Sequence, residues 1–425
     1  MKHGFAILII ITLTTFWLFG MNDISQNSGN SNQIDVVQKN SDNSTDDIVE
    51  IVDDEAELSA KVSDAVQKAL RFLKDSQSQN GYWLCDVGYK LNDSYQVTKT
   101  KGKHPGVTSI ACLAFMANGH FPGRGQYGDV VRKGLNFVLS TIKDGDLDPK
   151  NPGYASYDGT RMYSHAFSTL FLAEILGMAN FSAQVEKLIH EKLVLAVKLI
   201  VKSQNELGAW RYQPNATDAD TSIAVCQLQA LRAARNVGLK IPKKTIERVK
   251  EFIARSYETH DGSFYYQYNE NENGYYGGSR ASWTLTAAGI CAMQQAGQYQ
   301  SFYRKGDLIS LEKSINYLEQ GLYNHDERSG YNNYSYNSPT YRRFFGNVPR
   351  FDYFYGHYYA AQAIYQFSIK NKSLWDKWIT RVRKDFLSLQ RSNGSWSDQV
   401  GINYATAMAA LILQIHHEYL PIFQK

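Results

Sequence analysis

The chain has 425 residues, of which 43% are hydrophobic and 20% charged, values typical of a globular protein. Its length suits one large domain or two ordinary ones. It contains no P-loop, no dinucleotide-binding fingerprint and no nucleic-acid-binding motif, so we expect no nucleic-acid partner. Its four cysteines include no CxxC pair and three lie in apolar runs, which predicts buried free thiols.

An apolar run at residues 4–20 follows Lys2. It is slightly shorter than the ~20 residues that span a bilayer comfortably. No small-x-small cleavage site precedes Met21, and no lipobox cysteine is present. An uncleaved anchor and a signal peptide both fit. Residues 1–20 therefore predict a chain that is membrane-anchored and faces the periplasm or the extracellular space, or alternatively is secreted.

Residues 21–60 have the composition of a disordered acidic tether. They hold ten acidic residues against Lys39 alone, a net charge of −9, and they contain no aromatic residue. Residues 61–425 then carry +12. A basic domain suits an anionic ligand or a phospholipid surface. Alternatively, the tether simply offsets a cationic domain.

A turn motif recurs about every sixty residues in the rest of the chain. An amphipathic helix ends in a polar turn that closes on a Gly, with an aromatic residue within two positions. Three copies keep both Gln and Trp, and three shorter copies keep only the Gly and an aromatic residue. They are Gln79 to Trp83, Gln204 to Trp210, Gln390 to Trp396, Gly153-Tyr154, Gly262 to Phe264 and Gly330-Tyr331.

Two classes of helix alternate around these turns. One class is rich in Ala, Ser, Thr and Leu with few charges, over residues 106–118, 163–178, 220–237, 281–296, 355–366 and 403–414. The other is charged and amphipathic, over residues 66–75, 130–141, 194–203, 246–256, 311–321 and 379–390. Helices with few charges must be buried on most sides. A closed ring also removes the exposed ends of an open repeat array. The pattern predicts an all-α fold, an α/α toroid of six inner and six outer helices over residues 61–425, behind the N-terminal hydrophobic segment.

The repeated turns resemble the QW motif of the prenyltransferase and squalene-oxidase repeat superfamily. Short segments such as Tyr163-Ser-His165-Ala-Phe and Tyr355-Gly-His357-Tyr-Tyr resemble segments of uncharacterised exported bacterial proteins with these repeats. The resemblance implies the toroid fold. It also implies a terpene cyclase-like or prenyltransferase-like activity if the chain is an enzyme, and a bacterial membrane as its partner.

An acidic box precedes the third inner helix. Thr217-Asp218-Ala219-Asp220-Thr221 resembles the D-x-D-D-T box of class II terpene cyclases, in which a central Asp protonates the substrate. Ala219 takes the proton-donating position in one alignment, and Thr221 replaces the fourth residue in the other. A general acid needs a carboxyl group kept neutral by burial and a hydrogen-bonded partner. Asp218 and Asp220 are candidate catalytic acids, and the alternative is a helix cap beside a loop carboxylate.

His165 and His357 each lie two residues after a Tyr at the start of an inner helix. Inner helices of a toroid begin at one rim, so we expect both side chains to converge there with the two acids. Such a His/His/Asp set could bind zinc, and the alternative is that both are ordinary hydrogen-bonded histidines. The D-x-C pair through which protein prenyltransferases hold zinc is absent, so we predict no metal and no other cofactor.

Aromatic and cationic residues supply the candidate ligand-binding set. Aromatic faces stabilise cations and stack on sugars, and Arg pairs with carboxylate or phosphate. The candidates are Arg161, Tyr163, Arg280, Trp283, Tyr355 and Tyr359.

Three functions follow from these residues. The first is an exported toroid that binds a hydrophobic or anionic small molecule in an aromatic central cavity, isoprenoid-related, with Asp218 or Asp220 as acid. The second is a non-catalytic, membrane-tethered binding or scaffolding module. The third is a polysaccharide-active α/α barrel, with a set such as Tyr355, His357 and Arg161 across the cavity.

Overall fold

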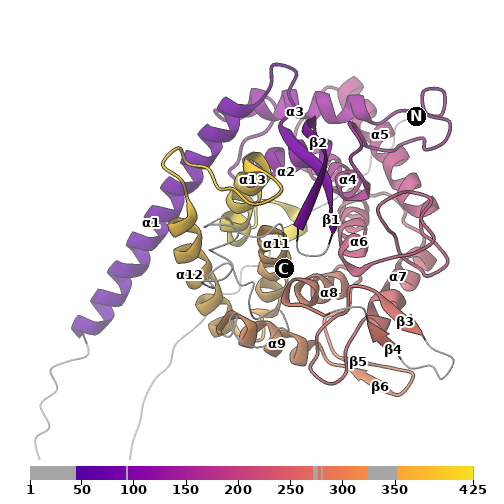
Figure 1. Cartoon of the computed structure of the whole chain (residues 1–425). Helices are drawn as coiled ribbons and strands as arrows, with labels where there is room; N and C mark the ends of the chain where they lie inside the picture. Colours follow the sequence, from indigo (N-terminus) through magenta and orange to yellow (C-terminus); the bar gives the residue numbers. More distant parts are fainter. Residues whose placement is uncertain (1–44, 92–93, 271–275, 279–280, 324–351, 425) are drawn as a thin grey trace, which may run out of the picture. The chain divides into compact units, whose positions relative to one another are not determined.

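A computed structural model describes residues 45–91, 94–270, 276–278, 281–323 and 352–424. The chain divides into two units, Met1–Val52 and Asp53–Lys425. The second unit is an α/α toroid, as the alternation of helices predicts (Figure 1).

Six helices form the inner layer of the toroid, and almost all their described side chains are buried. They are α2 (Pro105–Met116), α4 (Met162–Met178), α6 (Thr221–Asn236), α8 (Trp283–Gln295), α11 (Tyr353–Phe367) and α13 (Ile402–Gln414). Each packs on the next, and α13 packs on α2, which closes the ring. Small residues such as Ala111 and Ala407 let neighbouring helices approach closely.

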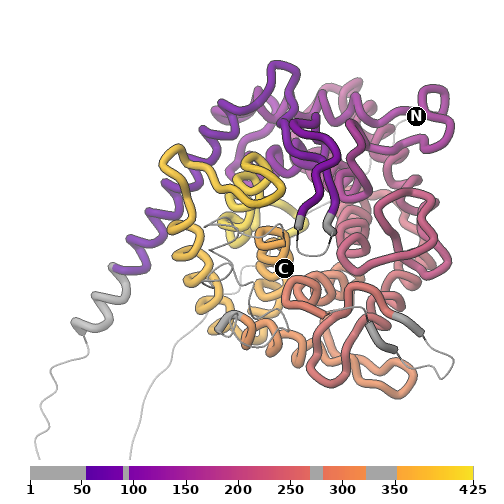
Figure 2. Tube along the Cα trace, viewed as in Figure 1, coloured from indigo at the N-terminus to yellow at the C-terminus, as the bar shows by residue number. Residues whose placement is uncertain are grey.

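Outer helices alternate with the inner ones along the chain. They are α1 (Thr45–Ser76), α3 (Gly128–Thr141), α5 (Ala183–Lys202), α7 (Lys243–Arg255), α9 (Leu311–Tyr323) and α12 (Lys372–Leu389). Figure 2 follows their order once around the ring, from indigo through magenta and orange to yellow. Each outer helix buries one apolar face and leaves its charged face in water.

The turn motif fastens each outer helix to its neighbour. The Gln204 side chain donates hydrogen bonds to Gly208 O (2.8 Å) and to Thr245 O of the next outer helix (2.9 Å). Trp210 Nε1 donates to Ile200 O (2.7 Å), which fixes the turn on the helix that it ends. The motif is therefore a structural fastener between neighbouring repeats.

The first and last repeats use the same contacts. Gln77, not Gln79 as the motif suggested, donates to Gly81 O and Val130 O. In each copy that contains a Gln, the Gln that makes these hydrogen bonds lies four residues before the Gly. Gln390 donates to Gly394 O and, 325 residues back along the chain, to Ala65 O (both 2.9 Å). This last contact joins the two ends of the ring.

The ring has two rims, which we call the amino rim and the carboxyl rim after the ends of the inner helices that lie there. The carboxyl rim is closed by the end of the chain, marked C in Figure 1. Phe423 is buried with its ring 6.1 Å from that of Tyr358, and Ile422 N donates to the buried carboxyl group of Glu174 (3.3 Å). Short helices at Ile415–His417 and Pro421–Phe423 carry this segment.

In the described part of the chain, three antiparallel hairpins lie at the rims, and the sequence pattern did not indicate them. They are β1 (Leu84–Leu91) with β2 (Ser94–Lys103), β3 (Tyr268–Glu270) with β4 (Tyr276–Gly278), and β5 (Phe302–Arg304) with β6 (Asp307–Ile309). The β1–β2 hairpin contacts the amino rim. Cys85 Sγ donates to Val400 O (3.2 Å), and Lys99 pairs with Asp158 (2.7 Å).

At the N-terminus, α1 begins at Thr45, inside the segment 21–60 whose composition predicts disorder. The compact second unit begins at Asp53 rather than at residue 61. The apolar run at residues 4–20 lies outside the described residues. Among the residues that are described, no helix is long and apolar enough to cross a membrane.

Candidate functional site at the amino rim

The first turns of three inner helices meet at the amino rim. The Tyr163 hydroxyl of α4 lies 2.6 Å from Ser222 Oγ of α6, and the Tyr355 hydroxyl of α11 donates to Ser222 O (2.6 Å). The two tyrosine rings meet edge to face, with centroids 6.1 Å apart. Two predicted ligand-binding residues are thus brought together, and both remain partly exposed.

Asp220 caps α6 beside these tyrosines and is fully buried. Its Oδ1 accepts hydrogen bonds from Ile223 N (2.9 Å) and from Ser222 Oγ (2.6 Å). Because Ser222 donates to Asp220, its oxygen is free to accept the Tyr163 proton. A hydrogen-bonded chain therefore runs from Tyr163 through Ser222 to the buried carboxyl group. The capping role that the sequence left open is real, and it positions this carboxyl at the rim.

Arg211 lies between the two acids of the box. Its Nε is 3.4 Å from Asp220 Oδ2, and its Nη1 is 3.4 Å from Asp218 Oδ2. Asp218 has 57% of its side chain exposed, whereas Asp220 is wholly covered. The guanidinium also lies over the rings of Tyr212 (4.5 Å) and Tyr266 (5.2 Å). The box therefore holds one surface carboxylate and one buried carboxyl group, bridged by a cation.

Opposing effects act on the buried carboxyl group. Burial raises the pKa of Asp220, because a charge is costly away from water. The Arg211 charge and the hydrogen bonds from Ser222 and Ile223 N lower it, and burial is the larger effect. Asp220 is thus more readily protonated than an ordinary aspartate.

Arg161 links the β1–β2 hairpin to this cluster. Its guanidinium lies 4.9 Å from the ring centroid of Tyr89 on β1 and 5.5 Å from that of Tyr212. Such contacts stabilise a cation and orient the aromatic rings. The hairpin is therefore part of the wall of the candidate site.

Tyr359 lies one turn deeper than Tyr355 and is fully buried. Its hydroxyl is 3.1 Å from Cys226 Sγ. Burial raises the pKa of the Cys226 thiol to about 12, so this sulfur stays protonated. The ring interior below the rim is lined by neutral aromatic and thiol groups.

His165 does not face this cluster. Its Nδ1 accepts the Ala155 N–H (3.1 Å), and its Nε2 lies 3.1 Å from Ala196 O of α5. Ala155 occupies in its turn the position that Trp83 occupies in the first repeat. The His165 ring, in place of a Trp side chain, holds that turn against the outer helix. Burial lowers the His165 pKa to about 4, so the ring is neutral. The structure places this residue between the two layers.

His357 and Trp283 also lie between the layers. The His357 ring packs 5.1 Å from Trp283 and 6.0 Å from Trp378 of α12. Trp283 Nε1 donates to Leu318 O of α9 (3.0 Å). Arg280, the remaining candidate, lies outside the described residues. Over the described parts of the chain, no three His, Cys, Asp or Glu side chains are grouped to hold a metal ion.

Sequence reasoning missed Arg211, Tyr266 and a second buried acid, Asp398. Asp398 Oδ1 accepts the N–H groups of Val400 (2.8 Å) and Gly401 (3.0 Å) beside the start of α13. Burial raises the Asp398 pKa to about 8. Arg211 and Asp398 follow a turn tryptophan by one and two residues. That position after the motif is the signal that could have found them.

No protein-family profile matches the chain, and no curated protein sequence is similar to it. Solved structures do resemble its fold. The cellobiose 2-epimerase from Bacillus thermoamylovorans B4167 is 16% identical, with 84% of this chain and 99% of that chain covered and a TM-score of 0.54. A GH76A alpha-1,6-mannanase from Salegentibacter sp. HEL1_6 is 8% identical, with 83% and 98% covered and a TM-score of 0.53. A variant of the type II terpene cyclase MstE from Scytonema, in complex with merosterolic acid A, is 11% identical, with 86% and 99% covered and a TM-score of 0.50.

These neighbours carry different activities on one fold, and their low identity to this chain shows the fold alone. The chain has the α/α-toroid fold.

Proposed function

We propose that the protein is an exported toroid that binds its ligand at the amino rim, and that Asp220 acts there as a general acid on an isoprenoid-related substrate. The observation that carries the proposal is one fully buried carboxyl group with a raised pKa among aromatic side chains. A general acid must hold its proton near neutral pH, and burial is the usual means.

The surroundings of Asp220 suit a reaction in which positive charge develops on the substrate. The faces of Tyr163 and Tyr355 line the partly exposed side of the cluster, and aromatic faces stabilise cations. Because Tyr163 is partly exposed, it can take a proton from water as its own passes through Ser222 to the carboxyl group, so both hydroxyl groups stay neutral. The Arg211 charge favours the ionised form of Asp220 and so opposes its action as an acid. Replacing Arg211 would therefore test that action.

A second candidate is a saccharide ligand, and the polarity of the rim favours it. The hydroxyl groups of Tyr163, Tyr212, Tyr266 and Ser222 lie in one cluster with Arg211. Sugars are bound by such hydroxyl and guanidinium groups together with aromatic faces. The epimerase and the mannanase show that this fold accommodates sugar chemistry in other proteins.

Product analysis by mass spectrometry distinguishes these functions. The full chain and its Asp220→Asn variant are incubated with squalene, with farnesyl and geranylgeranyl diphosphate, and with cellobiose and alpha-1,6-mannotriose. Asp376→Asn, a surface carboxylate of α12, is the matched control. The proposal expects an isoprenoid to be converted by the wild type and the control but not by Asp220→Asn. Conversion of a sugar alone favours the second candidate, and binding without conversion of any probe favours a non-catalytic module.

A further inference from the structure

We propose that the carboxyl rim is a docking surface for a bilayer rich in anionic phospholipids. This inference does not depend on the activity proposed for the amino rim. It rests on exposed apolar side chains and on the lysines around them.

Exposed apolar side chains gather at two neighbouring corners of the carboxyl rim. Tyr303 is 75% exposed and stands opposite Leu308 across the β5–β6 hairpin. Ile369, in the corner between α11 and α12, is 72% exposed. Lys370 Nζ lies 3.9 Å from the Glu312 carboxylate, so this corner adjoins the start of α9, directly after the hairpin. Single exposed apolar residues are common, but grouped ones mark contact surfaces.

Lysines surround this apolar surface. Residues 236–246, which form the corner between α6 and α7, hold three lysines and no acidic residue. Lys305 is exposed at the tip of the β5–β6 hairpin. Lys243 and Lys372 pair with an acid one turn further into their helices, at 3.3 Å and 2.7 Å. Such exposed pairs are weak, so these ammonium groups remain available to lipid phosphates.

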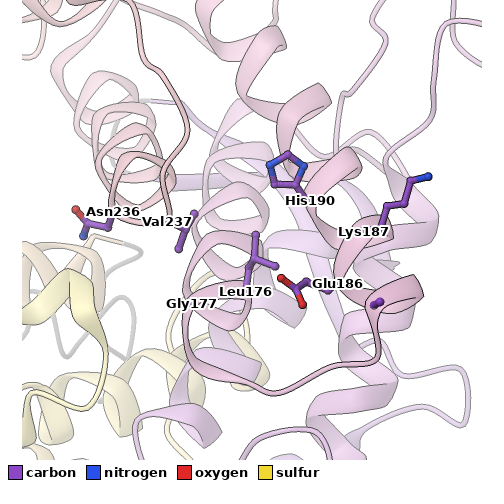
Figure 3. A pocket seen from close by; sticks show the side chains of 8 residues that line it. Leu176, Gly177, Glu186, Lys187, His190, Asn236 and Val237 are labelled. Atoms are coloured by element: carbon purple, nitrogen blue, oxygen red, sulfur yellow. The ribbon is translucent and has the colours of Figure 1, made fainter. Parts of the chain in front are cut away.

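A hollow of about 580 Å³ extends this surface from the corner between α6 and α7 to the corner between α4 and α5. Figure 3 shows Leu176 of α4 and Val237, which follows α6, on its apolar side, and Glu186, Lys187 and His190 of α5 on its polar side. Apolar area beside a cation is the arrangement that suits the boundary between lipid headgroups and acyl chains.

The chain enters the toroid at this same rim. Arg383 of α12 pairs with Glu55 near the start of the second unit (2.9 Å) and lies 3.1 Å from His416 Nε2, just beyond the end of α13. The acidic segment 21–60 leads to this entry point, so the lipid contact that we propose lies at the apolar and lysine-bearing corners and not at the entry itself. Docking would leave the Asp220 cluster facing water.

Fluorescence quenching by lipid tests the proposal. Tyr303→Cys and, as a control on the amino rim, Leu147→Cys are labelled with bimane in the full chain. All four native cysteines are buried, and Leu147 is 69% exposed. Vesicles contain phosphatidylcholine with brominated acyl chains, with or without phosphatidylglycerol. We expect quenching at position 303 that increases at least twofold with phosphatidylglycerol, and none at position 147. Equal quenching at both positions, no quenching at 303, or no dependence on phosphatidylglycerol would overturn the proposal.

A charge reversal tests the electrostatic part. In the labelled Tyr303→Cys chain, Lys240→Glu with Lys244→Glu should reduce quenching to its level without phosphatidylglycerol. The control pair, Lys143→Glu with Lys150→Glu, reverses two exposed lysines of the amino rim and should leave quenching unchanged. All four positions are exposed, so neither pair should alter the fold, which circular dichroism checks. The opposite pattern, with only the control pair effective, would contradict docking by the carboxyl rim.

Discussion

Closure of the ring by Gln390 gives the sharpest prediction for stability. Gln390→Leu keeps a side chain of similar length and removes both hydrogen bonds, to Gly394 O and to Ala65 O. A buried or partly buried hydrogen bond contributes about 0.5–1.5 kcal/mol, so we expect a loss of about 2 kcal/mol in the free energy of unfolding. Urea denaturation followed by circular dichroism measures it. The change should also separate α12 from α1, because this contact joins the two ends of the chain around the ring.

The matched control is Gln204→Leu, which removes the same two bonds between neighbouring repeats inside the ring. Both variants should lose similar free energy, but only Gln390→Leu should speed amide hydrogen exchange in α1 over residues 57–72. A loss below about 0.5 kcal/mol for Gln390→Leu would refute the energetic argument. Identical exchange patterns for the two variants would refute the role in closing the ring.

Three further changes have definite expected results. Gly208→Ala should cost at least about 1–2 kcal/mol in urea denaturation, because φ is 88° and the new Cβ would lie 2.7 Å from Arg248 O. His165→Leu should cost about 2–4 kcal/mol by the same assay, since both ring nitrogens bond backbone groups; a smaller loss than at an exposed histidine would contradict the fastening role. Asp398 and Glu174 keep their protons to about pH 8 in the native state but ionise near pH 4 when unfolded. Between about pH 4 and pH 8 the native state therefore binds more protons than the unfolded state. The free energy of unfolding should fall as pH rises through this range, by up to about 1.4 kcal/mol per pH unit for each proton. Asp398→Asn should make this fall less steep.

Much of the toroid could be predicted, because the turn motif and the alternation of helix types are local patterns. Gln204, Gly208 and Trp210 lie within seven residues, and their contacts repeat with the motif. The β1–β2 hairpin could not be predicted in the same way. Its strands lack a clean alternation of apolar and polar residues, and they are held by distant partners such as Val400.

The candidate site was predicted in part, and helix geometry explains the rest. Residues two positions apart on a helix point about 200° apart, at 3.6 residues per turn. Tyr163 and Tyr355 therefore face the ring interior, whereas His165 and His357 face the outer layer. Reading each Tyr-x-His phrase as one cluster joined side chains that point in opposite directions.

Residues supplied by loops were harder to find. Arg211 and Tyr266 reach Asp220 from two different turns, and no periodic pattern places a loop side chain. The buried carboxyl group that they surround was visible in the sequence only as part of an altered acidic box. The position of these residues just after the turn motif would have been a better guide to them than the acidic box.

Hydrogen exchange of the full chain with and without probe ligands tests most directly whether the amino rim binds the ligand. The probes are geranylgeranyl diphosphate and alpha-1,6-mannotriose, each added at saturating concentration to the wild type and to Asp220→Asn. We predict that one probe slows exchange in residues 211–222 and in the β1–β2 hairpin of the wild type. Asp220→Asn should still bind that probe, because Asn keeps the size of the side chain and its capping acceptor. Slower exchange confined to the carboxyl rim, or no change with either probe, would contradict ligand binding at the amino rim.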